Sequence, residues 1–277
     1  MKLFCVFCYS FMKIRPLSQI AAAVICSMAS HVPSCCLAAD VSLVGNTDAK
    51  ALASAPLLDS LGNHTVSDIN RDAVLSVEGR VLLNDAAGPE LECAELRIEV
   101  GSGQRFGAAL YMRKVLLRVL GDVSISSKQG ADATLALERS AVFRWNGTMK
   151  LAGPSARFSI AGKCVVEGGS LDIEDAKVRL IIQTQDMLER VFSENRSALI
   201  SVEREFSISA DATVQVILDK EVINSDLPEG EFIIVRGATN SGEVPQLEIT
   251  GVSPKQAARA SLKLDERGLM LIVASVP

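Results

Sequence analysis

The carboxylates of one short segment are the first candidates for chemistry. In "SLDIEDAKVRLII", residues 170–182, Asp172 and Glu174 lie two positions apart, and Asp175 follows directly. On an extended strand, residues i and i+2 point to the same face, so this pair would share a proton or bind calcium. Paired acids of this kind cleave polysaccharides in glycosidases. Apolar residues alternate with the two acids, and this alternation favours a plainer interpretation in which both are solvated on an outward face.

Other reactive groups are sparse. Beyond the first 39 residues the chain has a single histidine, His64, which lies in the polar stretch "LGNHTVSD". One histidine cannot build a histidine metal site, so we expect a solvated side chain there. The glycine-rich stretch "GSGQRFG", residues 101–107, has no following Gly-Lys-Ser/Thr and opens no helix, which favours a chain corner over a phosphate loop.

Composition and charge narrow the classes of partner. The chain is 48% hydrophobic and 22% charged, as in globular proteins, and its formal net charge of -5 argues against nucleic acid. The small cationic cluster of Arg113, Lys114 and Arg118 is therefore interpreted as a solvated strand face. Aromatic residues make up only 4% of the chain, so Tyr111 and Trp145 are the few large platforms for a sugar or base. We predict no catalytic, cofactor-binding or metal-binding residue.

The N-terminus has the organisation of a secretory leader. Basic residues precede an apolar run at 20–29, and small residues follow up to Ala39, which predicts cleavage near that residue. A membrane anchor is the weaker alternative, because the apolar run has about 10 residues and a span needs about 20. Translation from Met12 in place of Met1 would give a leader of more ordinary length. We expect a secreted or cell-surface protein with no membrane span after cleavage.

Cysteine usage follows from the leader. Five of the seven cysteines precede residue 40, and lipidation at Cys35 or Cys36 is an alternative form of anchorage. Cys93 and Cys164 remain, without the CxxC spacing of metal sites and too few for a disulfide framework. Each lies in an apolar stretch, where a free cysteine usually behaves as a small buried hydrophobe.

Short apolar–polar alternations dominate the chain from residue 74 onwards, and glycine, asparagine or aspartate closes them. They predict half-buried strands within 74–83, 95–100, 114–127, 133–147, 156–162, 163–169, 170–182, 205–218, 231–237, 246–251 and 261–274. Between 95 and 162 the centres lie about 20 residues apart, a period typical of stacked repeats. Two-residue hairpin signals are scarce, Asn146-Gly147 being the main one.

These patterns predict an all-β fold and, within it, a parallel β-helix over residues 74–277. Residues 1–39 would be the signal peptide and 40–73 an N-terminal cap or linker. An antiparallel β-sandwich has similar strand spacing and is the alternative. One segment departs from the alternation: 185–195 has apolar residues at helical spacing behind a cap at Thr184 or Asp186, which predicts a short helix that covers the core.

The C-terminal stretch carries a family resemblance. "GEFIIVRGATNSGEVPQLEITG" followed by "SLKLDERGLMLIVA" resembles the closing segment of autotransporter-associated β-strand repeat proteins, in which a G-x-aromatic-x-aliphatic-aliphatic strand precedes a glycine-rich loop and a terminal strand pair. The matching residues are Gly230, Phe232, Ile234, Val235, Gly242, Pro245, Gly251, Leu269, Leu271 and Val273. The match covers about fifty residues, with looser agreement over 135–182. The resemblance implies a right-handed β-helix exposed outside the cell and carries over no catalytic residue.

The predicted function is that of a secreted or cell-surface structural or adhesive β-helix protein without catalytic activity. Its expected partner is a cell-surface polysaccharide or another surface protein. The alternative is a polysaccharide-active lyase or hydrolase on the same fold, for which Asp172 is the first residue to test.

Overall fold

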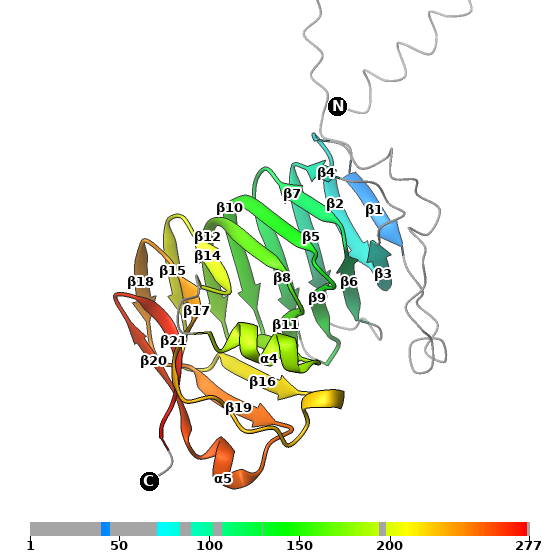
Figure 1. Ribbon diagram of the computed structural model, residues 1–277. Coiled ribbons are helices and arrows are strands. Elements are labelled where there is room, and N and C mark those ends of the chain that lie inside the picture. Colours follow the sequence, from blue (N-terminus) through cyan, green and yellow to red (C-terminus); the bar gives the residue numbers. More distant parts are fainter. Residues whose placement is uncertain are drawn as a thin grey trace, which may run out of the picture. The chain divides into compact units, whose positions relative to one another are not determined.

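The computed structural model describes residues 40–44, 71–83, 90–101, 107–128, 130–193 and 198–275, all within one compact unit that spans Ala38–Pro277. This part of the chain is mostly β (Figure 1). Its strands are β1 (Asp40–Val44), β2 (Val74–Glu78), β3 (Arg80–Leu83), β4 (Glu90–Cys93), β5 (Glu95–Val100), β6 (Ala108–Arg113), β7 (Leu116–Val119), β8 (Val123–Ser127), β9 (Ala133–Glu138), β10 (Val142–Ala152), β11 (Ala156–Ala161), β12 (Val165–Glu174), β13 (Lys177–Ile182), β14 (Ile200–Val202), β15 (Glu205–Ile208), β16 (Thr213–Leu218), β17 (Gly230–Arg236), β18 (Thr239–Gly242), β19 (Gln246–Thr250), β20 (Ala260–Asp265) and β21 (Gly268–Val273). Its helices are α4 (Gln185–Val191), the 3₁₀ helix η3 (Lys220–Val222) and α5 (Pro254–Ala257).

The strands form two sheets that the chain visits in turn. The first sheet follows the path β1-β2-β5-β8-β10-β12-β14-β17-β21-β20, with β4, β7, β15 and β18 paired beside it, and the second follows β19-β16-β13-β11-β9-β6-β3. Among the described strands, every pairing is parallel except β17 with β21 and β20 with β21. Parallel neighbours need a crossover between them, and each return to the first sheet adds either two short strands, such as β7 and β8, or one long strand, such as β10. The predicted all-β class is confirmed, and an antiparallel sandwich does not have this pairing.

The core lies between the two sheets and is built from rows of residues in register. One inward row of the second sheet consists of Val81, Leu110, Leu135, Phe158, Val178 and Val214. The corresponding row of the first sheet consists of Leu75, Leu96, Val123, Met149, Leu171 and Phe206. All of these side chains are buried. Side chains alternate between the faces of a strand, so the period-two pattern places one apolar residue of each strand in every row.

The repeat is less regular than the expected period of about 20 residues. Phe158 pairs with Val178, 20 positions later, whereas Val178 pairs with Val214, 36 positions later. The longer step contains α4, because the chain leaves the sheets after β13 and returns at β14. Insertions of this kind lengthen a loop without disturbing strand register, since loop length costs little free energy.

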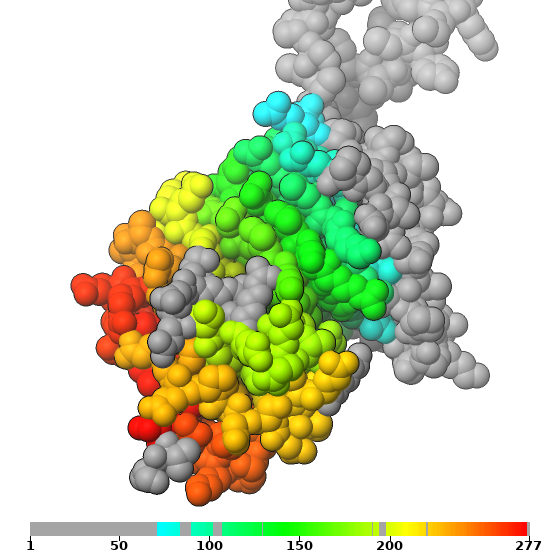
Figure 2. Space-filling model, viewed as in Figure 1, coloured from blue at the N-terminus to red at the C-terminus, as the bar shows by residue number. Residues whose placement is uncertain are grey.

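The predicted short helix is confirmed as α4. The hydroxyl of Thr184 accepts a hydrogen bond from the Met187 N–H at 3.3 Å and caps the helix. Leu188 and Phe192 are buried, and the Phe192 ring meets Phe232 of β17 edge-on with centroids 4.7 Å apart. The helix stands on the surface of the molecule, as the yellow-green atoms of Figure 2 show, and its apolar side covers the core.

The dipeptide Asn146-Gly147 is typical of a two-residue hairpin turn but has a different role in this structure. Asn146-Gly147 lies inside β10, at a register shift between Trp145 and Thr148, and not in a hairpin. A Cβ at Gly147 would lie 2.2 Å from Asp122 Oδ1, so the neighbouring chain approaches too closely for a side chain. The glycine therefore permits an irregularity in a long strand.

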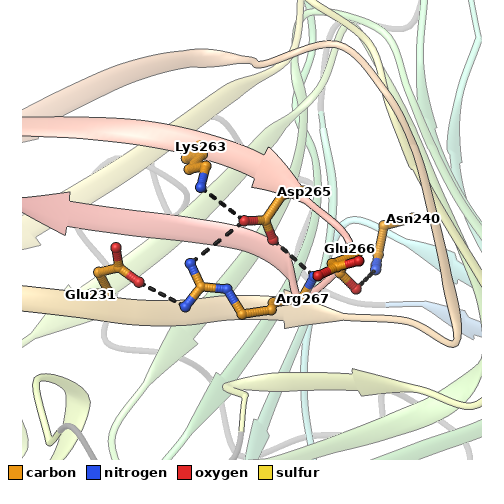
Figure 3. Close-up of polar contacts among 6 residues, drawn as sticks. All are labelled: Glu231, Asn240, Lys263, Asp265, Glu266 and Arg267. Carbon is orange, nitrogen blue, oxygen red and sulfur yellow. Dashed lines mark hydrogen bonds and ion pairs between the residues drawn. The ribbon is translucent and has the colours of Figure 1, made fainter.

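An antiparallel hairpin, β20 and β21, follows the last parallel strands and pairs with β17. Exposed polar contacts hold it (Figure 3): Asp265 accepts from Lys263 Nζ at 3.0 Å and from the backbone N–H of Arg267 at 2.8 Å. Arg267 Nη1 also lies 2.7 Å from Glu231 Oε2 on β17. The Lys263 contact first, and the Arg267 N–H second, lower the pKa of Asp265. The strand structure predicted within 261–274 is confirmed by this hairpin.

The predicted leader at 1–39, most of the predicted cap at 40–73, and His64 lie outside the described residues. Within the expected cap, the five residues of β1 pair in parallel with β2. The first sheet thus begins earlier than the alternation from residue 74 predicts.

Candidate functional site

The paired acids of β12 are engaged by a cation. Asp172 and Glu174 face outward, and Lys150 Nζ of β10 lies 3.0 Å from Glu174 Oε1 and 3.8 Å from Asp172 Oδ2. Ser207 Oγ donates a further hydrogen bond to Asp172 Oδ1 at 2.6 Å. The contact with Glu174 raises the pKa of Lys150. Lys150 therefore bridges the two carboxylates as an exposed ion-pair partner. Asp175 lies at the corner with φ of 47°.

The two arginines of the cationic cluster likewise form ion pairs between adjacent strands. Arg113 Nε lies 2.8 Å from Glu138 Oε2, and Arg118 Nη1 lies 3.7 Å from Glu92 Oε1. In both pairs the partners stand opposite each other in the strand register. Such partly exposed pairs contribute little stability individually but specify which residues face each other. This agrees with the interpretation of the cluster as a solvated strand face.

The two cysteines beyond the expected leader are free and buried. Cys93 of β4 stands three strand spacings from β12, through β7 and β10, and Cys164 directly precedes β12. The separation along the stack is therefore about 14 Å, too far for a disulfide. Burial raises the pKa of the Cys93 thiol to about 12 and that of Cys164 to about 11, so neither is a nucleophile at neutral pH.

The two candidate aromatic platforms have different positions. Trp145 is 1% exposed, stacks on Phe143 with centroids 5.6 Å apart, and donates its indole N–H to the Ser170 carbonyl at 2.8 Å. It is a core residue and unavailable to a ligand. Tyr111 is half-buried on the outward face of β6, where it lines a cavity.

This cavity of about 510 Å³ lies on the outward face of the second sheet. Its floor consists of small side chains on β6, β9 and β11, namely Ala109, Thr134, Ala136 and Ser159. Each is less than 10% exposed. Ala109 pairs with Thr134 and Ala136 pairs with Ser159 in the register, so small residues adjoin one another across neighbouring strands. Because none is bulky, a hollow remains between the longer side chains around them.

Arginines stand at both ends of the cavity. At the β3 end, Arg80 Nη2 donates to Tyr111 Oη at 3.0 Å, and its Cζ lies 5.5 Å from the Tyr111 ring centroid. At the other end are Arg157 of β11 and Arg179 of β13, and Arg157 Nη1 lies 2.8 Å from Asp132 Oδ2. The five strands from β3 to β13 are consecutive in the sheet, so the ends are about 19 Å apart.

Two buried polar atoms in the cavity lack hydrogen-bond partners. They are Ser159 Oγ and Arg179 Nε, and the two residues pair directly across β11 and β13. Ser159 is 3% exposed, and Arg179 takes part in none of the ion pairs among the described residues. Burial, and then the like charge of Arg157, lower the pKa of Arg179. Buried donors without partners are rare in folded proteins, and both of these atoms are available to bond a group that enters the cavity.

The carboxylates around the cavity are held by arginines. Asp132 pairs with Arg157, and Glu138 pairs with Arg113 at 2.8 Å. Within the described ranges no group of three or more His, Cys, Asp and Glu side chains has a metal-binding arrangement. The chemistry that this cavity offers is the binding of an anion.

Sequence reasoning had singled out Tyr111 but missed Arg80, Arg157, Arg179 and Ser159. The signal was present as small outward residues on three strands in succession, next to outward arginines. It was not recognised because the strands must first be aligned in register, and the spacing between partners varies.

No family model, curated protein or solved structure matches the chain. In the part of the chain that the structure describes, the helices are too short or too polar for a transmembrane span.

Proposed function

We propose that the chain is a secreted or cell-surface protein built as a right-handed parallel β-helix, with a structural or adhesive role and no catalytic activity. The observation that carries the proposal is the repeated parallel register, in which the chain visits two sheets alternately and adds a strand to each in turn. Right-handed crossovers are strongly preferred between parallel strands, which supports the proposed handedness. The leader pattern and the resemblance to autotransporter-associated β-strand repeat proteins support the location.

We infer a role in binding from the way in which the charged side chains are paired. Several acids on or beside both sheets have cationic partners, such as Lys150 beside Glu174 at 3.0 Å and Arg157 beside Asp132 at 2.8 Å. Stacked strands continue backbone pairing along the axis, so the fold gains rigidity without disulfides. A rigid scaffold with a polar hollow suits the presentation of a binding surface.

The stacked arrangement is tested with engineered cysteine pairs in a background without the native cysteines. Lys150 and Asp172 are register partners on adjacent strands, so Lys150→Cys with Asp172→Cys should form a disulfide under mild oxidation. Ser207 is the next residue in the same row, about 10 Å from residue 150, so Lys150→Cys with Ser207→Cys is the matched control and should not. Mass spectrometry of the non-reduced protein distinguishes the outcomes. A bridge in the control pair alone would contradict the stacking.

The location and the absence of catalysis are tested separately. Expression of the full chain in a secretion-competent host should yield an extracellular or surface-exposed product that begins near Asp40, as N-terminal sequencing would show. Incubation with acidic polysaccharides should release no reducing ends. Release that disappears in Asp172→Asn would instead favour the polysaccharide-active alternative, and full-length product retained in the cytoplasm would contradict secretion.

A further inference from the structure

We propose that the cavity on the second sheet binds an acidic sugar chain, with Ser159 and Arg179 holding a sugar carboxylate. The inference adds a ligand class to the proposed adhesive function and rests on that function for its biological setting. The cavity itself is independent of where the protein is located.

The first argument is the pair of buried donors. Ser159 Oγ and Arg179 Nε have no hydrogen-bond partner, and their residues are adjacent in one row of the sheet. A carboxylate offers two oxygens that accept hydrogen bonds, and a hydroxyl and a guanidinium N–H are suitable donors for them. One bound carboxylate would therefore satisfy both atoms. A neutral ligand would offer the Nε donor of Arg179 no negative charge to face.

The second argument is the charge of the lining. Arg80, Arg157 and Arg179 contribute three positive charges, and Asp132 and Glu138 contribute two negative charges, which leaves one positive charge. Arg157 already pairs with Asp132 at 2.8 Å. A single excess charge matches a carboxylate monoanion better than a phosphate dianion, because a second negative charge would face the carboxylates of the lining.

The third argument is the polarity and size of the rest of the cavity. Tyr111 and Thr134 bring hydroxyl groups, and Asp132 and Glu138 bring acceptors, all of which suit the hydroxyls of a sugar. The floor is made of small side chains, two of which, Thr134 and Ser159, carry a hydroxyl. The volume of about 510 Å³ falls in the range of small-molecule sites, and the length of about 19 Å suits a short chain of sugar units.

The experiment uses the protein as secreted and a uronic-acid trisaccharide as the probe. Binding is measured by isothermal titration calorimetry, with the fully methyl-esterified trisaccharide and inorganic phosphate as comparison ligands. We expect the uronate to bind, the neutral ester to bind at least about tenfold more weakly, and added salt to weaken the uronate complex. Arg179→Gln and Ser159→Ala should each weaken uronate binding, the former by at least about tenfold.

A matched variant separates the site from general charge effects. Arg144→Gln removes an arginine from the outward face of the first sheet, where Arg144 Nε lies 3.1 Å from Glu167 Oε2, and should leave uronate affinity unchanged. Thermal unfolding supplies a second measurement. The buried Nε of Arg179 has no hydrogen-bond partner in the unliganded protein, which is unfavourable, so Arg179→Gln should unfold at or above the wild-type temperature. Uronate should raise the unfolding temperature of the wild type and of Arg144→Gln but not of Arg179→Gln.

Several outcomes would overturn the proposal. The proposal fails if the ester binds as tightly as the uronate, or if phosphate binds more tightly than the uronate. It also fails if the uronate does not bind at millimolar concentration, or if folded Arg179→Gln and Ser159→Ala bind it with unchanged affinity. A lower unfolding temperature for unliganded Arg179→Gln would assign the arginine a structural role instead. None of these results alters the cysteine-pair, secretion or reducing-end experiments, so failure of the ligand assignment is distinguishable from failure of the proposed function.

Discussion

Gly168→Ala provides the most direct test of the packing between adjacent strands. Gly168 of β12 is the register partner of Trp145 on β10, and a Cβ at Gly168 would lie 2.0 Å from Trp145 Cδ2 and 2.1 Å from Cε2. The indole is 1% exposed and stacks on Phe143, so it has no free space into which to move. Gly168 does not have a positive φ, so the conflict is steric contact and not backbone strain. Adding one methyl group must therefore displace a large core side chain.

The size of the effect follows from three contributions. Overpacking a core costs about 1–3 kcal/mol. Displacement of the indole also loses its 2.8 Å hydrogen bond to the Ser170 carbonyl, which contributes about 1 kcal/mol. Replacing glycine by alanine restricts the unfolded chain and offsets about 0.4–1 kcal/mol of this loss. We expect a net loss of about 2 kcal/mol in the free energy of unfolding, or a decrease of about 4–8 °C in the unfolding temperature for a chain of this size.

The chain contains one tryptophan, so its fluorescence reports directly on this site. Urea unfolding is followed by tryptophan emission and by far-UV circular dichroism, and Gly168→Ala should shift both midpoints downward together. Gly101→Ala is the matched control, because a Cβ at Gly101 would have no atom within 4 Å. The reasoning fails if Gly168→Ala unfolds within about 0.5 kcal/mol of the wild type, the usual range of surface substitutions. It also fails if Gly101→Ala is equally destabilised.

Three further predictions concern other parts of the fold. Cys93 and Cys164 should resist alkylation in the native protein and react only after unfolding, as peptide mapping would show, since burial raises their pKa values to about 12 and about 11; rapid native labelling would contradict their burial. Phe192→Ala should reduce stability by about 3–5 kcal/mol in chemical denaturation, because it leaves a void beneath α4, whereas Ile223→Ala, at a side chain 55% exposed, should have little effect. The pKa of Asp265 is lowered in the folded state, so its contribution is present above its unfolded pKa of about 3.9 and is lost as pH falls through the folded value. Asp265→Asn should therefore be less stable than the wild type near neutral pH, and the difference should disappear as pH falls through the folded pKa of Asp265; a difference that grows in acid would contradict this sign.

The local structure was largely predictable because neighbouring residues encode it. Apolar–polar alternation in "ARFSIAG" and "KVRLII" predicted β11 and β13, since side chains on a strand alternate between its faces. The helix α4 was predicted by helical spacing and a cap at Thr184, and both are present. The burial of Cys93 and Cys164 followed from the apolar stretches in which they lie. The strands β4, β6, β14 and β18 were missed, because they are short or lie beside interruptions such as the glycine-rich segment at 101–107.

The chain by itself thus determined the β class, the short helix and the burial of both thiols, all of which depend on residues close together in sequence. Only the tertiary structure decided which strands are neighbours and in what register, because these depend on loops whose lengths vary between one strand and the next. Ser159 and Arg179 are 20 positions apart and become partners only when β11 lies beside β13. The cavity, the arginines around it and the two donors without hydrogen-bond partners result from that alignment. For this reason, the apolar–polar alternation and the spacing of the strands along the sequence could not reveal them.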